Sequence, residues 1–312
     1  MHASLQSDLP IPPAMRRAFG TLLMTWLACF ASGCCYFNNL NGPEQFERGY
    51  TLVLPGIEGP SHFNSDIAQG LRDGGVDTAI EVHDWTSGNF LNFLSHLRND
   101  AHHRREAESL AAEIVAYQDA YPGRPVHLVG MSGGGGMALL TLEQLPADRR
   151  VTSVMLLAPA ISPQYDLRQV LDRTEYGIWN FSSLGDIFIL GAGTSVAGTI
   201  DGKHSPSAGM VGFRPPADDP DAYRGRVREI RYSLDMALDG NLGGHMGTSS
   251  RSFIKKHVAT RLASLPDPNT SGERAAEQPL PEASQTLAPG QADDDVPASA
   301  SEFQLHLSRA HR

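Results

Sequence analysis

Cysteine is scarce in this sequence. Cys29, Cys34 and Cys35 are the only cysteines among 312 residues. The chain beyond them therefore has no disulfide, no thiolate nucleophile and no cysteine ligand for a metal. It also has no HExxH pair, no cysteine–histidine cluster and no calcium-loop pattern. No metal and no organic cofactor is expected.

Positive charge is also in short supply, since the formal net charge is −10. Residues 266–312 hold eight acidic residues against three Lys/Arg and are rich in Pro, Ala, Glu, Ser and Gln. Such a segment buries too little apolar surface to offset the entropy of ordering it. We predict a disordered acidic tail over 266–312. The acidity of the chain argues against a nucleic-acid partner.

No apolar run near the start is long enough for a membrane span. Arg16-Arg17 precedes an uncharged stretch over 18–32, and Ala31-Ser32-Gly33-Cys34 follows. We interpret 1–33 as a signal peptide, with Met15 as an alternative start. The four residues from Ala31 to Cys34 resemble a bacterial lipoprotein lipobox, although Ala31 stands where leucine is commonest.

That resemblance implies that Cys34 is acylated. The protein would then be exported and held by its lipid on a membrane facing the periplasm or the cell exterior, with 34–49 as a tether. An ordinary signal peptide cut nearby, or an uncleaved anchor, is the alternative interpretation.

The middle of the chain, 50–265, alternates between apolar strand-like runs and helix-like segments. Strands are expected at 50–55, 77–83, 125–129, 151–157, 176–181 and 227–233, and helices at 65–73, 105–117, 137–145, 162–174 and 248–265. Continuous apolar strands between helices are typical of an α/β fold: a mostly parallel, doubly wound sheet with helices on both faces. One domain of this class fits the length.

The strongest motif lies at one strand-to-helix junction. Gly130-Met131-Ser132-Gly133-Gly134 follows the apolar run 125–129 and precedes the helix-like 136–145. A serine between small residues on such a turn is typical of a nucleophile elbow. A glycine-rich phosphate-binding turn is the alternative, but neither a Gly-Lys-Ser/Thr ending nor a G-x-G-x-x-G opening is present.

The elbow and the order of elements resemble the α/β-hydrolase fold over about residues 50 to 265. Members of that superfamily place a serine, an acid and a histidine in this chain order. The resemblance implies Ser132 as nucleophile, Asp186 as acid and His245 as base. Asp201 is the alternative acid and His204 the alternative base, whereas His127, inside a strand, is expected to be a packing residue.

An oxyanion hole needs two backbone N–H donors. By position we expect them from Gly133 and from Ile57, in the loop after the first strand. Glu58 beside Ile57 is interpreted as a solvated loop charge, with a substrate contact as the alternative. The short segment 160–175 argues against a large lid.

Together these features predict a serine hydrolase that cleaves a carboxylic ester, or a related acyl bond, of a small or lipid-like substrate through an acyl-serine intermediate. The alternatives are a serine acyltransferase and a non-catalytic, lipid-anchored binding protein on the same fold.

Overall fold

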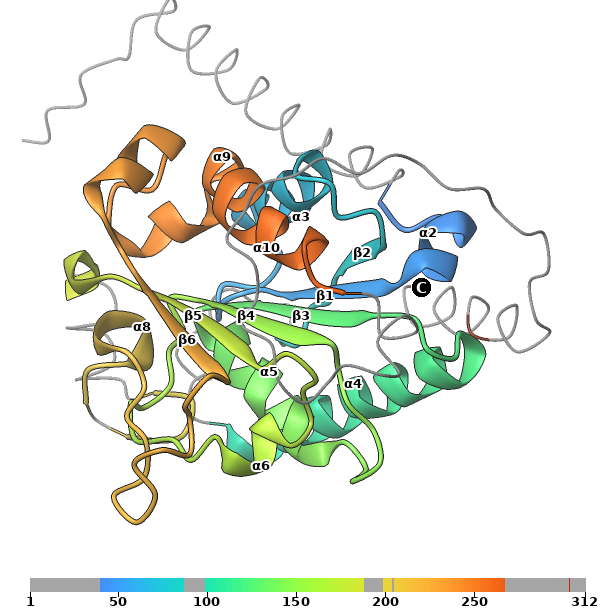
Figure 1. The fold of residues 1–312 in the computed structure, drawn as a ribbon, viewed down its shortest axis with the longest axis horizontal. Coiled ribbons are helices and arrows are strands. Elements are labelled where there is room, and N and C mark those ends of the chain that lie inside the picture. The colour runs from blue at the N-terminus through green and yellow to red at the C-terminus, as the bar shows by residue number, and fades with distance from the viewer. Residues whose placement is uncertain (1–39, 87–98, 188–198, 204, 267–302, 304–312) are drawn as a thin grey trace, which may run out of the picture. The chain divides into compact units, whose positions relative to one another are not determined.

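A computed structural model describes residues 40–86, 99–187, 199–203, 205–266 and 303, with the backbone alone at 186 and 187. Its centre is a six-stranded sheet in the order β2-β1-β3-β4-β5-β6 (Figure 1). All neighbouring strands run parallel. The strands are β1 (Tyr50–Leu54), β2 (Ala79–Val82), β3 (Val126–Met131), β4 (Ser153–Leu157), β5 (Ile178–Ser182) and β6 (Val227–Arg231).

Helices cover both faces of this sheet. Figure 1 shows α3, α9 and α10 on one face and α4, α5 and α6 on the other. Their bounds are α3 (His62–Asp73), α4 (Asp100–Ala120), α5 (Gly133–Gln144), α6 (Arg168–Leu171), α9 (Arg251–Phe253) and α10 (Thr260–Ala263), with the π-helical η7 (Ile254–Ala259) joining the last two. Short elements complete the described fold: α2 (Pro43–Arg48), α8 (Ala208–Val211) and the 3-10 turns η4 (Leu184–Ile187), η5 (Leu234–Asp239) and η6 (His245–Ser249). Within the described ranges, no helix is long and apolar enough to cross a membrane.

Burial explains why the central strands read as continuous apolar runs. Successive side chains of a strand point to opposite faces, and here both faces are covered. In β3, Leu128 packs into the core under α4 and α5, while Val129 packs into the core under α3 and α9. In β4, Leu156 packs into the first of these cores and Met155 into the second. The predicted α/β fold with a doubly wound parallel sheet is confirmed.

The order of the strands defines where a ligand can approach. From β1 the chain moves outward to β2, then returns to the other side of β1 to form β3. The winding direction therefore reverses between β1 and β3. In open α/β sheets this reversal opens a crevice at the carboxyl ends of the strands, where ligands bind. The turn after β3 and the loop after β1 meet at this crevice.

Several predicted helices differ from the structure. The helix expected at 105–117 spans 100–120, and the one expected at 248–265 begins at Arg251 and is π-helical over 254–259. The helix expected at 137–145 begins at Gly133, since α5 starts directly after Ser132. The helix expected at 162–174 is wrong except for the single turn α6. Pro163 disfavours helical backbone at Ser162, and the Ser162 N–H is bonded to the carboxylate of Asp201.

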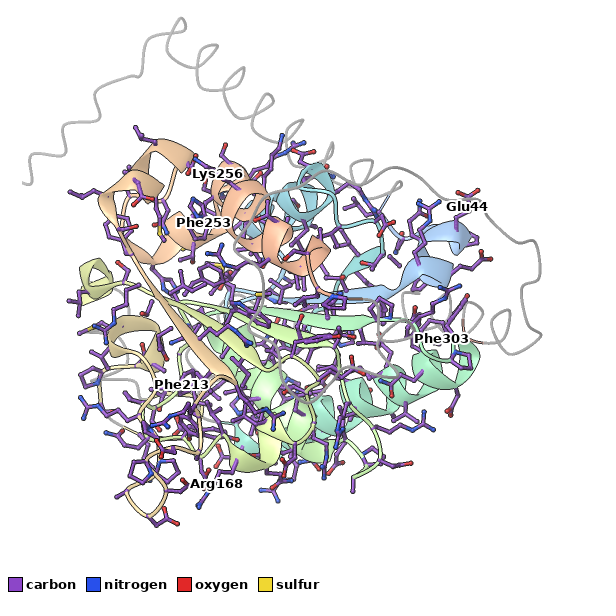
Figure 2. The ribbon with its side chains drawn as sticks, in the orientation of Figure 1. Glu44, Arg168, Phe213, Phe253, Lys256 and Phe303 are labelled. Atoms are coloured by element: carbon purple, nitrogen blue, oxygen red, sulfur yellow. The ribbon has the colours of Figure 1, made fainter. Side chains whose placement is uncertain are left out.

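The folded part also begins earlier than predicted. Leu40 and Phe46 lie in the segment interpreted as a tether, yet both are buried in the two cores, and α2 forms there. In the predicted tail, Phe303 is buried as well. Its ring lies in T-shaped contact with Phe46, at a centroid distance of 5.7 Å, and near Tyr50, Tyr117 and Tyr121. Figure 2 shows Phe303 beside α4. The composition of the segment around Phe303 is polar overall, so the sequence did not reveal this contact.

Replacing Phe303 with alanine should lower the free energy of unfolding by about 3 kcal/mol, because a fully packed aromatic ring is lost. A denaturant titration measures this. Phe46→Ala and the double variant complete a mutant cycle, and the two changes should be non-additive, since the rings are in contact. Additive effects, or no effect of Phe303→Ala, would show that Phe303 does not occupy the cluster.

Candidate active site

Among the described residues, Ser132 and Ala158 are the non-glycine residues with a positive φ. The φ of Ser132 is 51° and its ψ is −119°, between the end of β3 and the start of α5. A non-glycine residue in such a conformation is strained by about 1–3 kcal/mol and persists only where its surroundings hold it. The Ser132 N–H donates to the carbonyl of Leu157 at 2.9 Å, and the Ser132 carbonyl accepts from Ala160 at 2.9 Å. The last residue of β4 and the segment just after that strand thus fix the serine in place.

The glycines around Ser132 leave no room for side chains. A Cβ atom on Gly134 would collide with the carbonyl oxygens of Leu54 and Pro55 at the end of β1. A Cβ on Gly130 would lie 2.5 Å from the carbonyl oxygen of Gly134. Strand, turn and helix therefore approach one another as closely as the motif predicted. This crowding is what holds Ser132 in its strained conformation.

The loop after β1 lies directly against the serine turn. The Ile57 Cγ2 atom is 2.7 Å from the position that a Cβ on Gly133 would take. Trp85, which is completely buried, holds this loop by donating its Nε1–H to the carbonyl of Pro55 at 2.7 Å. The structure thus brings together the two expected oxyanion donors, Ile57 and Gly133. Sequence reasoning missed Trp85, whose only signal is an isolated aromatic shortly after a strand.

Glu58 is not the solvated charge that the sequence suggested. Its Oε1 atom is buried and has no hydrogen-bond partner among the described residues. The carboxyl group folds back over Gly56, whose absent side chain leaves the space. Burial raises the pKa of Glu58, while its attraction to His245 opposes that rise. A carboxyl group that interacts electrostatically with His245 therefore lies on the loop that approaches Ser132.

His245 begins η6, in the loop that follows β6. Its side chain is buried, with 8% exposed. The neighbouring Gly243 is held by two contacts: its N–H donates to Asn241 Oδ1 at 3.0 Å, and its carbonyl accepts from Ser183 Oγ. Ser183 stands between β5 and η4. The loop of His245 therefore packs against the loop in which Asp186 lies.

The backbone of Asp186 lies in η4, directly after β5. Its side chain lies outside the described part of the chain, as does the alternative base His204. The assignment of Asp186 as acid stays a prediction, and so does the choice between His245 and His204.

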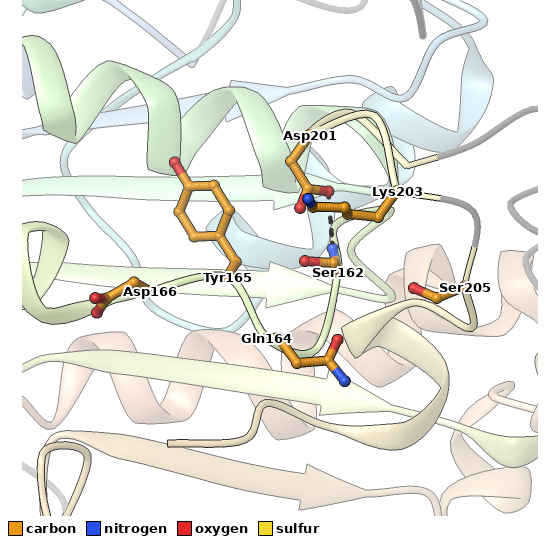
Figure 3. A pocket seen from close by; sticks show the side chains of 7 residues that line it. All are labelled: Ser162, Gln164, Tyr165, Asp166, Asp201, Lys203 and Ser205. Atoms are coloured by element: carbon orange, nitrogen blue, oxygen red, sulfur yellow. Dashed lines mark hydrogen bonds between the residues drawn. The ribbon is translucent and has the colours of Figure 1, made fainter. Parts of the chain in front are cut away.

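Asp201, the alternative acid, has partners elsewhere. Its Oδ1 accepts from the Ser162 N–H at 3.0 Å and from Thr199 Oγ1 at 2.5 Å. Figure 3 shows Asp201 at an open pocket together with Tyr165 and Lys203. Neither Ser132 nor His245 lines this pocket. These contacts tie the loop 199–203 to the segment after β4, which is sufficient to explain an aspartate at this position.

His127 behaves as the sequence indicated. It is buried within β3 and its Nδ1 lies 2.8 Å from Ser153 Oγ on β4. Burial lowers its pKa to about 4, so the imidazole is neutral at ordinary pH. It is a hydrogen-bonded packing residue of the sheet.

No group of three His, Cys, Asp or Glu side chains that could hold a metal ion is found in the described ranges. Cys34 lies outside those ranges, so its acylation and the membrane anchor stay predictions.

Two kinds of similarity to known proteins are found. The sequence model of the alpha/beta hydrolase fold family matches residues 81–205. Among solved structures, an esterase named PE8 is similar, with 17% sequence identity and a TM-score of 0.36, over 64% of this chain and 85% of the esterase chain. The comparison with curated proteins gave no match. The six parallel strands, the helices on both faces and the family match together show an α/β-hydrolase fold.

The buried carboxyl group of Glu58 should make stability depend on pH. Because the pKa of Glu58 is raised in the folded state, the folded protein binds a proton at this carboxyl group more tightly than the unfolded chain does. The folded state therefore loses stability as the pH rises through the unfolded pKa toward the folded one. Glu58→Gln removes this loss. The variant should therefore gain stability relative to the wild type as the pH rises above 4.5, the ordinary pKa of a glutamate.

Thermal unfolding across this pH range measures the difference. Glu44→Gln is the matched control, since the Glu44 side chain is 79% exposed on α2. A stability difference between Glu58→Gln and wild type that does not change with pH would show that the carboxyl group is solvated after all.

Proposed function

We propose that this chain is a serine hydrolase with Ser132 as its nucleophile. The backbone conformation of Ser132 at the carboxyl end of β3 carries the proposal. That conformation is costly, and it lies at the crevice where the sheet changes its winding direction. Strain of this kind is kept where it presents a reactive side chain.

In the proposed reaction, the Ser132 hydroxyl oxygen attacks the carbonyl carbon of an acyl substrate. His245 takes the hydroxyl proton and passes it to the leaving alcohol oxygen as the acyl-oxygen bond breaks. Water then attacks the acyl-serine with His245 again as base, which releases the acid and restores Ser132. A neutral histidine suits this role because its pKa lies near neutrality.

Charge develops on the carbonyl oxygen during each attack. The N–H groups of Gly133 and Ile57 are the proposed donors to it, and the close approach of Ile57 to Gly133 supports this pairing. The N-terminus of α5 adds a favourable partial positive charge at the same point, since the helix begins at Gly133.

Asp186 is the better candidate for the acid that orients His245. The contact of Ser183 with Gly243 places its loop against that of His245, whereas the described contacts of Asp201 are with Ser162 and Thr199. The bond cleaved is proposed to be a carboxylic ester; a thioester or an amide would need the same groups. The second candidate function is transfer of the acyl group to an acceptor other than water, and no contact among the described residues favours it.

Ser132→Ala should abolish hydrolysis of p-nitrophenyl esters and labelling by a fluorophosphonate probe. The loss should reach four orders of magnitude or more, roughly 5 kcal/mol of transition-state stabilisation. His245→Ala should cost nearly as much, because the groups act as a unit. Circular dichroism checks that the variants fold. Labelling of a folded Ser132→Ala protein would refute the nucleophile.

Asp186→Asn should lower kcat by several orders of magnitude, because an amide can hold the wrong tautomer of the histidine. Asp201→Asn is the matched control and should act mainly on stability, by loosening the loop 199–203. Rates of ester hydrolysis and melting temperatures separate the two effects. A large loss of kcat at Asp201 with near-normal turnover at Asp186 would reverse the assignment.

A further inference from the structure

The short helix α8 joins the carboxyl ends of β4 and β5. It contacts both β5 and the turn η4 (Figure 1). Its second residue, Gly209, makes two backbone hydrogen bonds that leave the helix. The Gly209 N–H donates to the carbonyl of Pro159, after β4, at 3.0 Å, and the Gly209 carbonyl accepts from the N–H of Ser183, directly after β5, at 2.9 Å. A single residue therefore connects the two strand ends.

On the β4 side, this connection meets the segment that holds the proposed nucleophile. Leu157 and Ala160 fix the backbone of Ser132 by hydrogen bonds to its N–H and its carbonyl. Between them lies Ala158, the second non-glycine residue with a positive φ in the described ranges, at 46°. The chain over 157–160 thus bends around the serine in a strained conformation. A shift of this segment would also move Ser132.

Gly209 approaches this bent segment more closely than any other residue type would allow. A Cβ atom on Gly209 would lie 2.4 Å from the carbonyl carbon of Ala158 and 2.6 Å from the nitrogen of Pro159. Both are backbone atoms, so they cannot rotate out of the way as the end of a side chain could. The separation of α8 from the end of β4 is therefore one that requires glycine.

On the β5 side, the connection continues to the loop of the proposed base. Ser183, which is buried, donates its Oγ–H to the carbonyl of Gly243, two residues before His245. A Cβ atom on Gly185 would lie 2.5 Å from the same carbonyl oxygen, so the two loops are in close backbone contact. The contacts of Gly209 and Ser183 thus form a continuous path from the segment around the nucleophile to the loop of the base.

Buried polar side chains hold α8 on the sheet. Asn180 of β5 has no exposed surface, and its Nδ2 donates to the carbonyl of Ala208 at 3.1 Å and to Glu229 Oε2 at 2.8 Å. Glu229 Oε1, on β6, accepts from the N–H of Phe213, just after α8, at 2.8 Å. Both ends of the helix are therefore bonded to the strands beneath it. Buried hydrogen bonds of this kind are costly to break, which makes α8 a fixed spacer.

We propose that Gly209 and Ser183 are positioning residues, which set the distance between Ser132 and His245 through α8. The effect on the reaction rests on the proposed serine-hydrolase function, whereas the contacts that form the spacer do not. Proton transfer from the serine needs its hydroxyl within hydrogen-bond reach of the imidazole. A displacement of about 1 Å can lower a rate about 100-fold without any change in the reacting groups themselves.

Gly209→Ala tests the spacer from the side of the nucleophile. The rate constant for labelling by a fluorophosphonate probe should fall about tenfold or more, because the new Cβ pushes residues 157–160 away. The final labelled fraction should remain as in the wild type. Gly74→Ala is the matched control, since a Cβ there would lie 2.6 Å from the carbonyl oxygen of Lys255, outside the contacts of α8. It should lower the melting temperature and leave the labelling rate constant unchanged.

Ser183→Ala tests the spacer from the side of the base and adds no bulk to the fold. Hydrogen exchange of peptides from residues 241–249 should become several-fold faster, because the loop loses its bond to Ser183. Peptides from α4 serve as the internal control and should exchange as in the wild type. The labelling rate constant should fall several-fold as well. Exchange over 241–249 that stays unchanged would overturn the connection between the two loops.

The labelling experiment separates this proposal from the proposed function. A wild-type protein that takes no label removes the hydrolase function, and with it the catalytic role of the spacer, whatever the exchange shows. A labelled wild type whose rate constant is retained in both Gly209→Ala and Ser183→Ala removes the positioning role alone. An equal loss of rate in Gly74→Ala would also overturn that role, because the effect would then follow stability and not the contacts of α8.

Discussion

The close approach of three backbone segments around Ser132 is the constraint on which the site depends. The ends of β1 and β3 and the start of α5 lie so near one another that neither Gly130 nor Gly134 has room for a Cβ atom. Under this crowding the serine takes a backbone conformation that it would avoid in an open chain. The same contacts set the position of the loop after β1, since Ile57 rests on Gly133. The nucleophile and the proposed oxyanion donors are thus products of one packing arrangement.

The other side of the crevice is built from the loops of β5 and β6. Their contact through Ser183 and Gly243 makes one surface of two loops, and that surface carries the buried His245. Glu58 approaches the same histidine from the loop after β1. Asn64 and the backbone of Gly56 are hydrogen-bonded to this carboxyl group, whereas its buried Oε1 atom has no partner among the described residues. Leaving that oxygen unpaired is costly.

The sequence predicted the fold where the physics is local or periodic. Continuous apolar strands such as β4 and the Gly130–Gly134 motif gave the parallel sheet and the turn at Ser132 correctly. Prediction failed where a contact joins distant segments. Phe303 and Leu40 pack into the cores from polar surroundings, and the helix expected at 162–174 gave way to a loop held by Asp201. The sequence suggested a surface charge at Glu58, because the neighbouring residues do not reveal that its carboxyl group folds back over Gly56.

A crystal structure of the protein after reaction with an alkyl phosphonate tests the central claim most directly. The account predicts a covalent bond from Ser132 Oγ to phosphorus. It also predicts that the phosphoryl oxygen lies within about 3 Å of the N–H groups of Gly133 and Ile57, and that His245 lies within hydrogen-bond reach of Ser132 Oγ. An adduct on another residue, or a phosphoryl oxygen turned away from both N–H groups, would contradict it.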